Sequence, residues 1–194
     1  MEQLVVGSRS SVVGTRVGAV VLGTALVTLA AQISVPLPGT PVPMTLQPLA
    51  VLLVGGLLGA RLGATSMVLY LALGIAGLPV FTPTVPLVGV ARLVGPTGGY
   101  LLAYPVAAFA VGWLTDPGRQ PGVNPPRWAR VTMGVLCGLV LIHAGGLAQL
   151  AILTGNLEGA ARLGTLPFLL GDLAKLAVAT AVLTKLTPAV RARL

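Results

Sequence analysis

Asp172 and Lys175 are two ionisable residues inside an otherwise apolar stretch, in the segment GDLAK. On insertion scales, an Asp or a Lys at the centre of a membrane helix costs about 2.5–3.5 kcal/mol, so such residues usually mark a substrate or ion pathway. Their spacing of three residues places both on one face of a helix. Because a carboxylate accepts hydrogen bonds and an ammonium donates them, the pair predicts a binding site for a polar ligand group. A structural ion pair that neutralises itself is the alternative.

A proton relay is a third interpretation of the pair. Such a relay usually includes several acidic groups or a histidine at a matching depth. The only histidine, His143, lies midway along a different apolar stretch. We expect it to be a core side chain that is hydrogen-bonded to a neighbour. The single cysteine, Cys137, excludes an internal disulfide and a cysteine-based zinc site.

The composition identifies the class of protein that contains these residues. Of 194 residues, 55% are hydrophobic and 8% are charged, whereas soluble domains have about 25% charged residues. Such a chain cannot cover a water-facing surface with polar groups, so a soluble enzyme is excluded and an all-α integral membrane protein is predicted. Its length fits a single domain, residues 1–194. The net charge of +8 is not gathered in a basic run, which argues against nucleic-acid binding.

Six apolar segments predict six transmembrane helices, the second of which is short for a span of roughly 20 residues. The first segment is longer than a signal-peptide core and further segments follow it, so we interpret it as a retained helix. Residues 36–43 contain four prolines and predict a stiff, extended loop. We expect loops also at 82–97 and 116–130 and a short linker at 156–165. The predicted spans are about 17–35, 45–60, 62–81, 98–115, 129–154 and 166–186.

The basic residues predict the orientation of these helices. With the N-terminus in the cytoplasm, nine Lys and Arg residues fall in cytoplasmic segments and two, Arg92 and Arg162, fall in outer loops. This bias predicts that both termini lie in the cytoplasm. The predicted location of the protein is the plasma or inner membrane of the cell. The bias also places the proline-rich loop and the Asp172–Lys175 pair toward the outer face.

Other polar residues flank the apolar segments on that outer side. The Arg92 guanidinium suits a ligand carboxylate or a lipid headgroup. Helix capping accounts for Thr45, whereas the amide of Gln47 suits the wall of a cavity. Tyr100 follows a glycine-rich turn and either anchors the helix at the membrane interface or packs against a ligand. The candidate substrate-binding residues are therefore Asp172, Lys175, Arg92, Tyr100, Gln47 and Thr45.

Small residues recur four positions apart in the first segment, as Gly14 and Gly18 and as Ala19 and Gly23. This spacing permits close approach of another helix. The approaching helix belongs either to the same bundle or to a partner membrane subunit.

Several motifs together closely resemble the BioY family, the biotin-binding S components of energy-coupling factor transporters. The likeness extends over about residues 30–180. It is carried by PLPGTPVPMTLQP after Val35, LGARLGA after Leu57, ALGIAGLPVF after Leu71, PTGGYLLAYPVAA after Gly95, and GDLAK at 171–175.

The resemblance implies a six-helix S component that captures biotin from outside. A transmembrane T component and two cytoplasmic ATPases would supply the energy, since this chain has no nucleotide-binding motif of its own. In the family, the Asp and Lys that match Asp172 and Lys175 lie at the ligand. Arg92 is our candidate for binding the valerate carboxylate, and residues 42–47 resemble the lid over the site.

The resemblance implies no cofactor besides the transported ligand. An S component for another vitamin, such as thiamine or riboflavin, is the alternative function. An intramembrane enzyme is disfavoured, because the sequence has one histidine, one cysteine and no nucleophile or metal motif.

Overall fold

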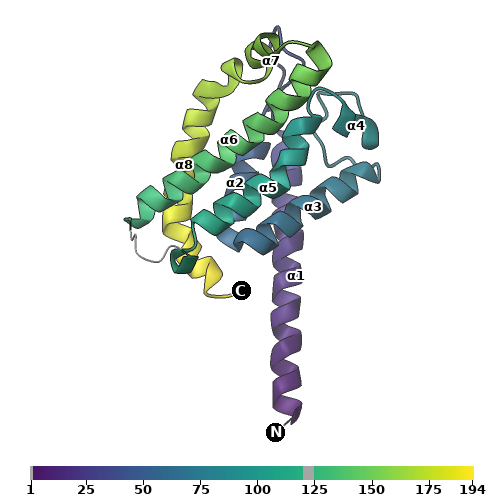
Figure 1. The fold of residues 1–194 in the computed structure, drawn as a ribbon. Helices are drawn as coiled ribbons and strands as arrows, with labels where there is room; N and C mark the ends of the chain where they lie inside the picture. Colours follow the sequence, from purple (N-terminus) through teal and green to yellow (C-terminus); the bar gives the residue numbers. More distant parts are fainter. Residues whose placement is uncertain (1, 120–124) are drawn as a thin grey trace.

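The computed structural model describes residues 2–119 and 125–194, with side chains at positions 12–118 and 125–194. Residues 120–124 of the predicted loop at 116–130 lie outside the described residues. The described part is mostly helical and forms one bundle, from which the N-terminal half of the first helix projects (Figure 1).

A helix occurs in each of the six apolar segments. The long elements are α1 (Glu2–Gln32), α2 (Gln47–Leu58), α3 (Ala60–Ile75), α5 (Gly98–Leu114), α6 (Arg127–Thr154) and α8 (Leu169–Arg191). Shorter elements connect them, namely β1 (Ser34–Val35), β2 (Met44–Thr45), α4 (Val90–Val94), η1 (Pro117–Arg119), α7 (Leu157–Gly164) and η2 (Leu166–Phe168).

Three described stretches are long and apolar enough to cross a membrane: Val12–Gln32, Arg127–Thr154 and Leu157–Arg191. The helices α2, α3 and α5 are apolar but have 12, 16 and 17 residues. At 1.5 Å per residue, helices of this length are shorter than the roughly 30 Å hydrocarbon core of a bilayer. The predictions that six helices cross the membrane and that both termini lie in the cytoplasm therefore remain predictions.

Several predicted boundaries are wrong for local reasons. The first helix ends at Gln32 because Ser34–Val35 pairs antiparallel with Met44–Thr45. The third helix ends at Ile75, since Gly77 adopts a φ of +90°, outside the helical range.

The predicted linker at 156–165 is the helix α7. The Asn156 side chain caps it by accepting a hydrogen bond from the backbone N–H of Glu158. Glu158 and Arg162 then form an exposed ion pair at an i,i+4 spacing, 2.7 Å apart.

Glycines allow the bundle helices to approach closely. A methyl group at Gly99 would collide with the carbonyl oxygen of Gly145, so α5 and α6 touch through their backbones. The α2–α3 corner turns at Gly59, whose φ is +85°, and the backbone of this corner packs on Gly112 of α5. These contacts fix α5 at the centre of the bundle.

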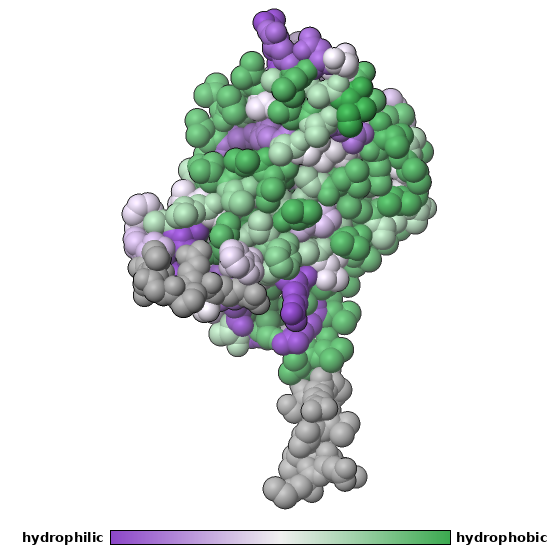
Figure 2. Space-filling view, viewed as in Figure 1, coloured by the Kyte–Doolittle hydropathy of each residue, from purple (hydrophilic) through white to green (hydrophobic). Residues whose placement is uncertain are grey.

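The two termini lie toward the same end of the molecule. The Arg16 Nε donates to the Leu194 carbonyl oxygen at 3.1 Å, and Figure 1 shows α4 and α7 at the opposite end. Figure 2 shows a broad apolar surface between polar residues at the two ends of the bundle. This arrangement suits a bilayer around the middle of the bundle.

Arg191 connects three helices at the end that carries the C-terminus. Its Nη2 donates to the carbonyl oxygens of Gly56 and Gly112 at 2.6 and 3.2 Å, and to Thr115 Oγ1 at 2.8 Å. Arg191→Met leaves these acceptors without the donor, so we expect it to lower the free energy of unfolding by about 3 kcal/mol. Thermal unfolding in detergent measures the effect. Arg193→Met at an exposed position is the control, and equal midpoints for the two variants would contradict the prediction.

Candidate functional site

A small pocket lies in the half of the bundle that carries α4 and α7. Its walls come from α2, α4, α5, α6 and α8, and from the loops at 42–45 and 82–97. All six residues singled out from the sequence line this pocket, although they come from four separate stretches of the chain. They are Thr45, Gln47, Arg92, Tyr100, Asp172 and Lys175.

The acid–base pair occupies the first two turns of α8. The Lys175 Nζ donates to the Asp172 Oδ1 at 2.9 Å, as the three-residue spacing predicts. Both side chains are buried, with 8% and 10% of their surface exposed. The pair therefore neutralises itself, and its remaining hydrogen-bonding capacity is directed into a pocket rather than into lipid. Each carboxylate oxygen retains a lone pair, and the ammonium retains two N–H groups.

His143 of α6 is a further member of this cluster. Its Nε2 lies 2.6 Å from the Asp172 Oδ2, so the expectation of a hydrogen-bonded core histidine is confirmed. It also lines the pocket, which sequence reasoning did not predict. The available signal was the position of a histidine midway along an apolar segment.

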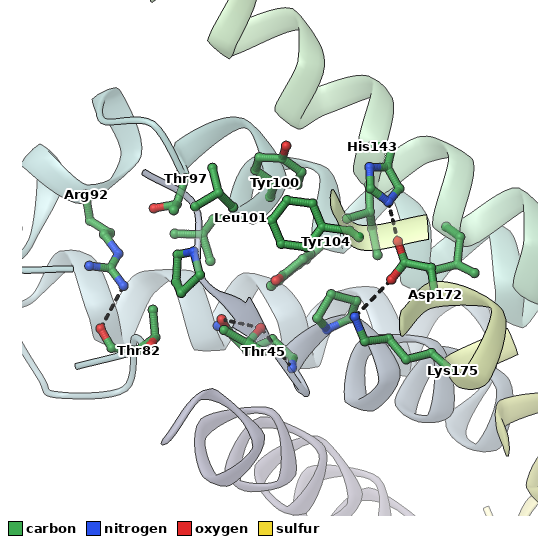
Figure 3. A pocket seen from close by; sticks show the side chains of 17 residues that line it. Thr45, Thr82, Arg92, Thr97, Tyr100, Leu101, Tyr104, His143, Asp172 and Lys175 are labelled. Carbon is green, nitrogen blue, oxygen red and sulfur yellow. Dashed lines mark hydrogen bonds and ion pairs between the residues drawn. The ribbon is translucent and has the colours of Figure 1, made fainter. Parts of the chain in front are cut away.

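Arg92 of α4 lies on the other side of the pocket, as Figure 3 shows. It is 1% exposed, so the lipid-headgroup interpretation is wrong. Its Nη1 donates to the carbonyl oxygens of Val85 at 2.5 Å and Leu87 at 3.4 Å, and its Nη2 donates to that of Thr82 at 2.8 Å. Burial lowers the pKa of Arg92, but a guanidinium remains protonated in proteins.

Two guanidinium donors of Arg92 remain. The group carries five N–H bonds, and the three contacts above use three of them. The Nε is buried with no hydrogen-bond partner among the described residues. An unpaired buried donor is costly, and two free N–H groups match a carboxylate.

Gln149 of α6 fixes the loop that carries Arg92, and sequence reasoning missed it. Its Nε2 donates to the carbonyl oxygens of Leu93 at 2.9 Å and Gly95 at 2.7 Å. These carbonyls belong to the C-terminal end of α4 and the residue after it. The amide therefore joins α4 to the long helix that also carries His143.

Tyr100 at the start of α5 is buried, so its interpretation as an interfacial anchor is wrong. Its hydroxyl donates to the Gly164 carbonyl oxygen at 2.5 Å, at the end of α7. The ring lines the pocket and lies edge-on to the His143 ring, 6.2 Å away. Tyr104, one turn later on α5, also lines the pocket.

Gln47 and Thr45 form the base of the pocket at the start of α2. The Gln47 Nε2 donates to the Tyr70 hydroxyl at 2.5 Å, and that hydroxyl donates to the Val80 carbonyl oxygen at 3.1 Å. The backbone N–H of Gln47 donates to the Thr45 Oγ1 at 3.3 Å. Thr45 belongs to β2, however, and the N-cap of α2 is Leu46, with no side-chain cap, so the prediction that Thr45 caps the helix is wrong. Tyr70 is a fully buried partner that sequence reasoning did not identify.

The proline-rich loop lies against the pocket. Val42 and Pro43 line it, and the Thr40 Oγ1 donates to the Leu163 carbonyl oxygen of α7 at 2.6 Å. The cavity itself has a volume of about 50 Å³. This is far below the roughly 300–1,000 Å³ of typical small-molecule sites, so a larger ligand requires the lining to move.

Comparison with known proteins assigns the family. Residues 7–192 match the BioY family. The chain belongs to the BioY family. A probable biotin transporter BioY from Pyrococcus horikoshii is 38% identical over 170 residues, covering 88% of this chain and 94% of that protein. The biotin transporter BioY from Thermotoga maritima is 36% identical over 163 residues, covering 84% and 90%.

A solved structure has the same fold. It is the crystal structure of the S component for biotin from an ECF-type ABC transporter, with a TM-score of 0.77 and 27% sequence identity. The match covers 90% of this chain and 91% of that one. As a BioY family member with several apolar helices, this chain is a multi-pass protein of the cell membrane.

Proposed function

We propose that this chain is a biotin-binding S component, which captures biotin at the outer face of the membrane for uptake. The observation that carries the proposal is the pocket, which has a buried acid–base pair on one side and a buried arginine with free donors on the other. Six spans with both termini in the cytoplasm complete the proposal. This orientation places the pocket in the outer half of the bilayer.

The Asp172–Lys175 side of the pocket complements the ureido ring of biotin. That ring has two N–H donors and one carbonyl acceptor and carries no charge. The free lone pairs of the Asp172 carboxylate accept from the N–H groups, and the free N–H groups of Lys175 donate to the ureido oxygen. Because the protein pair is already neutral, a neutral ligand group adds no uncompensated charge.

The Arg92 side complements the carboxylate of the valerate chain. The two unused N–H groups of the guanidinium provide charge-assisted hydrogen bonds to a carboxylate. The aromatic and aliphatic residues between the two sides, among them Tyr104, Leu101 and Ile142, suit the apolar part of biotin.

We propose that the loop at 36–43 opens to admit biotin, since the cavity of about 50 Å³ is too small for it. The loop is fastened by the Thr40–Leu163 hydrogen bond and turns at Gly39, which has a positive φ. Its movement would uncover the pocket from the outer side.

A transmembrane T component and two cytoplasmic ATPases complete the proposed transporter, with ATP used by those partners. The face of α1 at Gly14 and Gly18 suits a helix of the T component, since no described atom of another part of the bundle lies within 4 Å of a methyl group placed there. Gly23, by contrast, packs on Val54 and Ser66 inside the bundle. The two small-residue pairs therefore serve different contacts.

Replacing Gly14 and Gly18 by Leu tests this face. We expect the double variant to bind biotin as the wild type does but to assemble poorly with a T component, because the added side chains keep a helix at a distance. Co-purification with the T component and biotin uptake measure the effect. Val12→Leu, at an exposed position on the opposite face of α1, is the control, and normal assembly of the glycine variant would assign the T-component contact elsewhere.

Equilibrium binding of biotin to the purified protein in detergent tests the proposed function. We expect tight binding of biotin and none of thiamine or riboflavin, the ligands of the alternative S components. A monodisperse, folded sample that fails to bind biotin would contradict the proposal.

A further inference from the structure

His143 has a contact that its apolar surroundings do not require. Its ring packs near Tyr100 and Phe168, with ring centroids 6.2 and 6.5 Å away. A phenyl ring would satisfy both contacts. The imidazole instead directs Nε2 at the Asp172 Oδ2, 2.6 Å away and on a different helix.

The chemistry of this contact defines the donor. An ionised carboxylate only accepts hydrogen bonds, so the proton of the bond is on the histidine Nε2. The opposite carboxylate oxygen accepts from Lys175 at 2.9 Å. The carboxylate is therefore held from two sides, by a donor from α6 and by a donor from α8 itself.

The two donors differ in how well they fix the carboxylate. Lys175 belongs to the same helix as Asp172 and reaches it through a flexible four-carbon stem. The terminal torsion of an aspartate is itself broad. The imidazole has two side-chain torsions where Lys175 has four, its ring packs near two aromatic rings, and it originates from the facing helix. The hydrogen bond from His143 therefore sets the plane of the Asp172 carboxylate relative to the Arg92 side of the pocket.

We propose that His143 is a positioning residue for ligand recognition, which holds the Asp172 carboxylate in the orientation that accepts the N–H groups of the ligand's ureido ring. The inference rests on the proposed function, because it assigns a role within the same pocket. Orienting the acceptor before the ligand arrives reduces the ordering cost of binding. His143 affects the affinity for biotin through the contact of Asp172 with the ureido ring, and it does not affect the contact made by the ligand carboxylate.

Two substitutions separate the donor from the ring. His143→Phe keeps the aromatic contacts and removes the N–H, and His143→Gln supplies an amide N–H at a similar reach. We expect the Phe variant to bind biotin roughly 10- to 100-fold more weakly, as for a lost hydrogen bond to a charged group. The Gln variant recovers most of the affinity. Val140→Phe, on an exposed face of α6, is the matched control and binds as the wild type does.

A double-mutant cycle tests whether His143 acts through Asp172. In an Asp172→Asn background, we expect His143→Phe to cause little further loss. Biotin methyl ester differs from biotin only at the carboxylate, on the opposite side of the ligand from the ureido ring. We expect the loss of affinity on replacing biotin by this ester to be the same in the wild type and in His143→Phe. These two results together distinguish a positioning role from a general loss of packing.

Wild-type affinity in His143→Phe, or equal weakness of the Phe and Gln variants, would overturn this inference while leaving the proposed function intact. Full additivity of His143→Phe with Asp172→Asn would overturn it as well. Failure of the wild-type protein to bind biotin would instead contradict the proposed function.

Discussion

Asp172→Asn weakens biotin binding by about 1–3 kcal/mol, the range for one lost charge-assisted hydrogen bond. The amide keeps one oxygen acceptor but replaces the second oxygen by a donor, which faces either His143 or Lys175, both of them donors in the structure. The ureido N–H groups then lose an ionised acceptor. Titration of the purified protein with biotin gives the dissociation constant that measures this loss.

Folding must be separated from binding in this variant, because removal of one member of a buried ion pair leaves its partner uncompensated. A monodisperse elution profile and thermal unfolding without ligand report on folding. Glu158→Gln removes an equal charge from the exposed surface of α7 and is the matched control. Unchanged biotin affinity in folded Asp172→Asn would remove Asp172 from the site.

Arg92→Gln abolishes the preference of the protein for biotin over biotin methyl ester. The wild-type guanidinium has two free donors for the ligand carboxylate, a contact of roughly 3 kcal/mol for a charged hydrogen-bonded pair. The ester lacks the charge, so the wild type binds it more weakly. The variant lacks the guanidinium, so we expect similar affinities for both ligands. Competition of each compound against labelled biotin measures the ratio.

The ratio of affinities is the informative quantity, since Arg92 also binds the carbonyls of its own loop. If the substitution only collapses the loop, the binding of both ligands is weakened and the ratio of their affinities is preserved. Arg162→Gln removes an exposed arginine of α7 and keeps the wild-type ratio. A variant at Arg92 that still prefers the free acid would assign the carboxylate contact to another residue.

The BioY membership and the fold of an S component agree with what the sequence motifs predict. The helical segments could be predicted because each is a continuous apolar run, a property of neighbouring residues. Their ends were less predictable. The turn at Gly77 and the pairing of Ser34–Val35 with Met44–Thr45 depend on the backbone of short loops.

The candidate binding residues divide in the same way. Asp172 and Lys175 were predictable as a pair because three residues along a helix bring two side chains to one face. Gln47 and Arg92 were identified because they are polar residues beside apolar segments. The partners of these residues could not be predicted, because they are distant in the sequence. Tyr70 is 23 residues from Gln47, and Gln149 is more than 50 residues from the carbonyls that it binds.

The amino-acid sequence is sufficient to identify a helical membrane protein of the BioY family and the charged pair that it buries. The three-dimensional structure is needed to show that His143 reaches the carboxylate of Asp172 and that Arg92 faces the same pocket from the opposite side. Hydrophobic periodicity shows that a helix is buried, but not its rotation or its neighbours. Close glycine contacts such as Gly99 on Gly145 set that packing, and the packing brings residues from distant segments into one site.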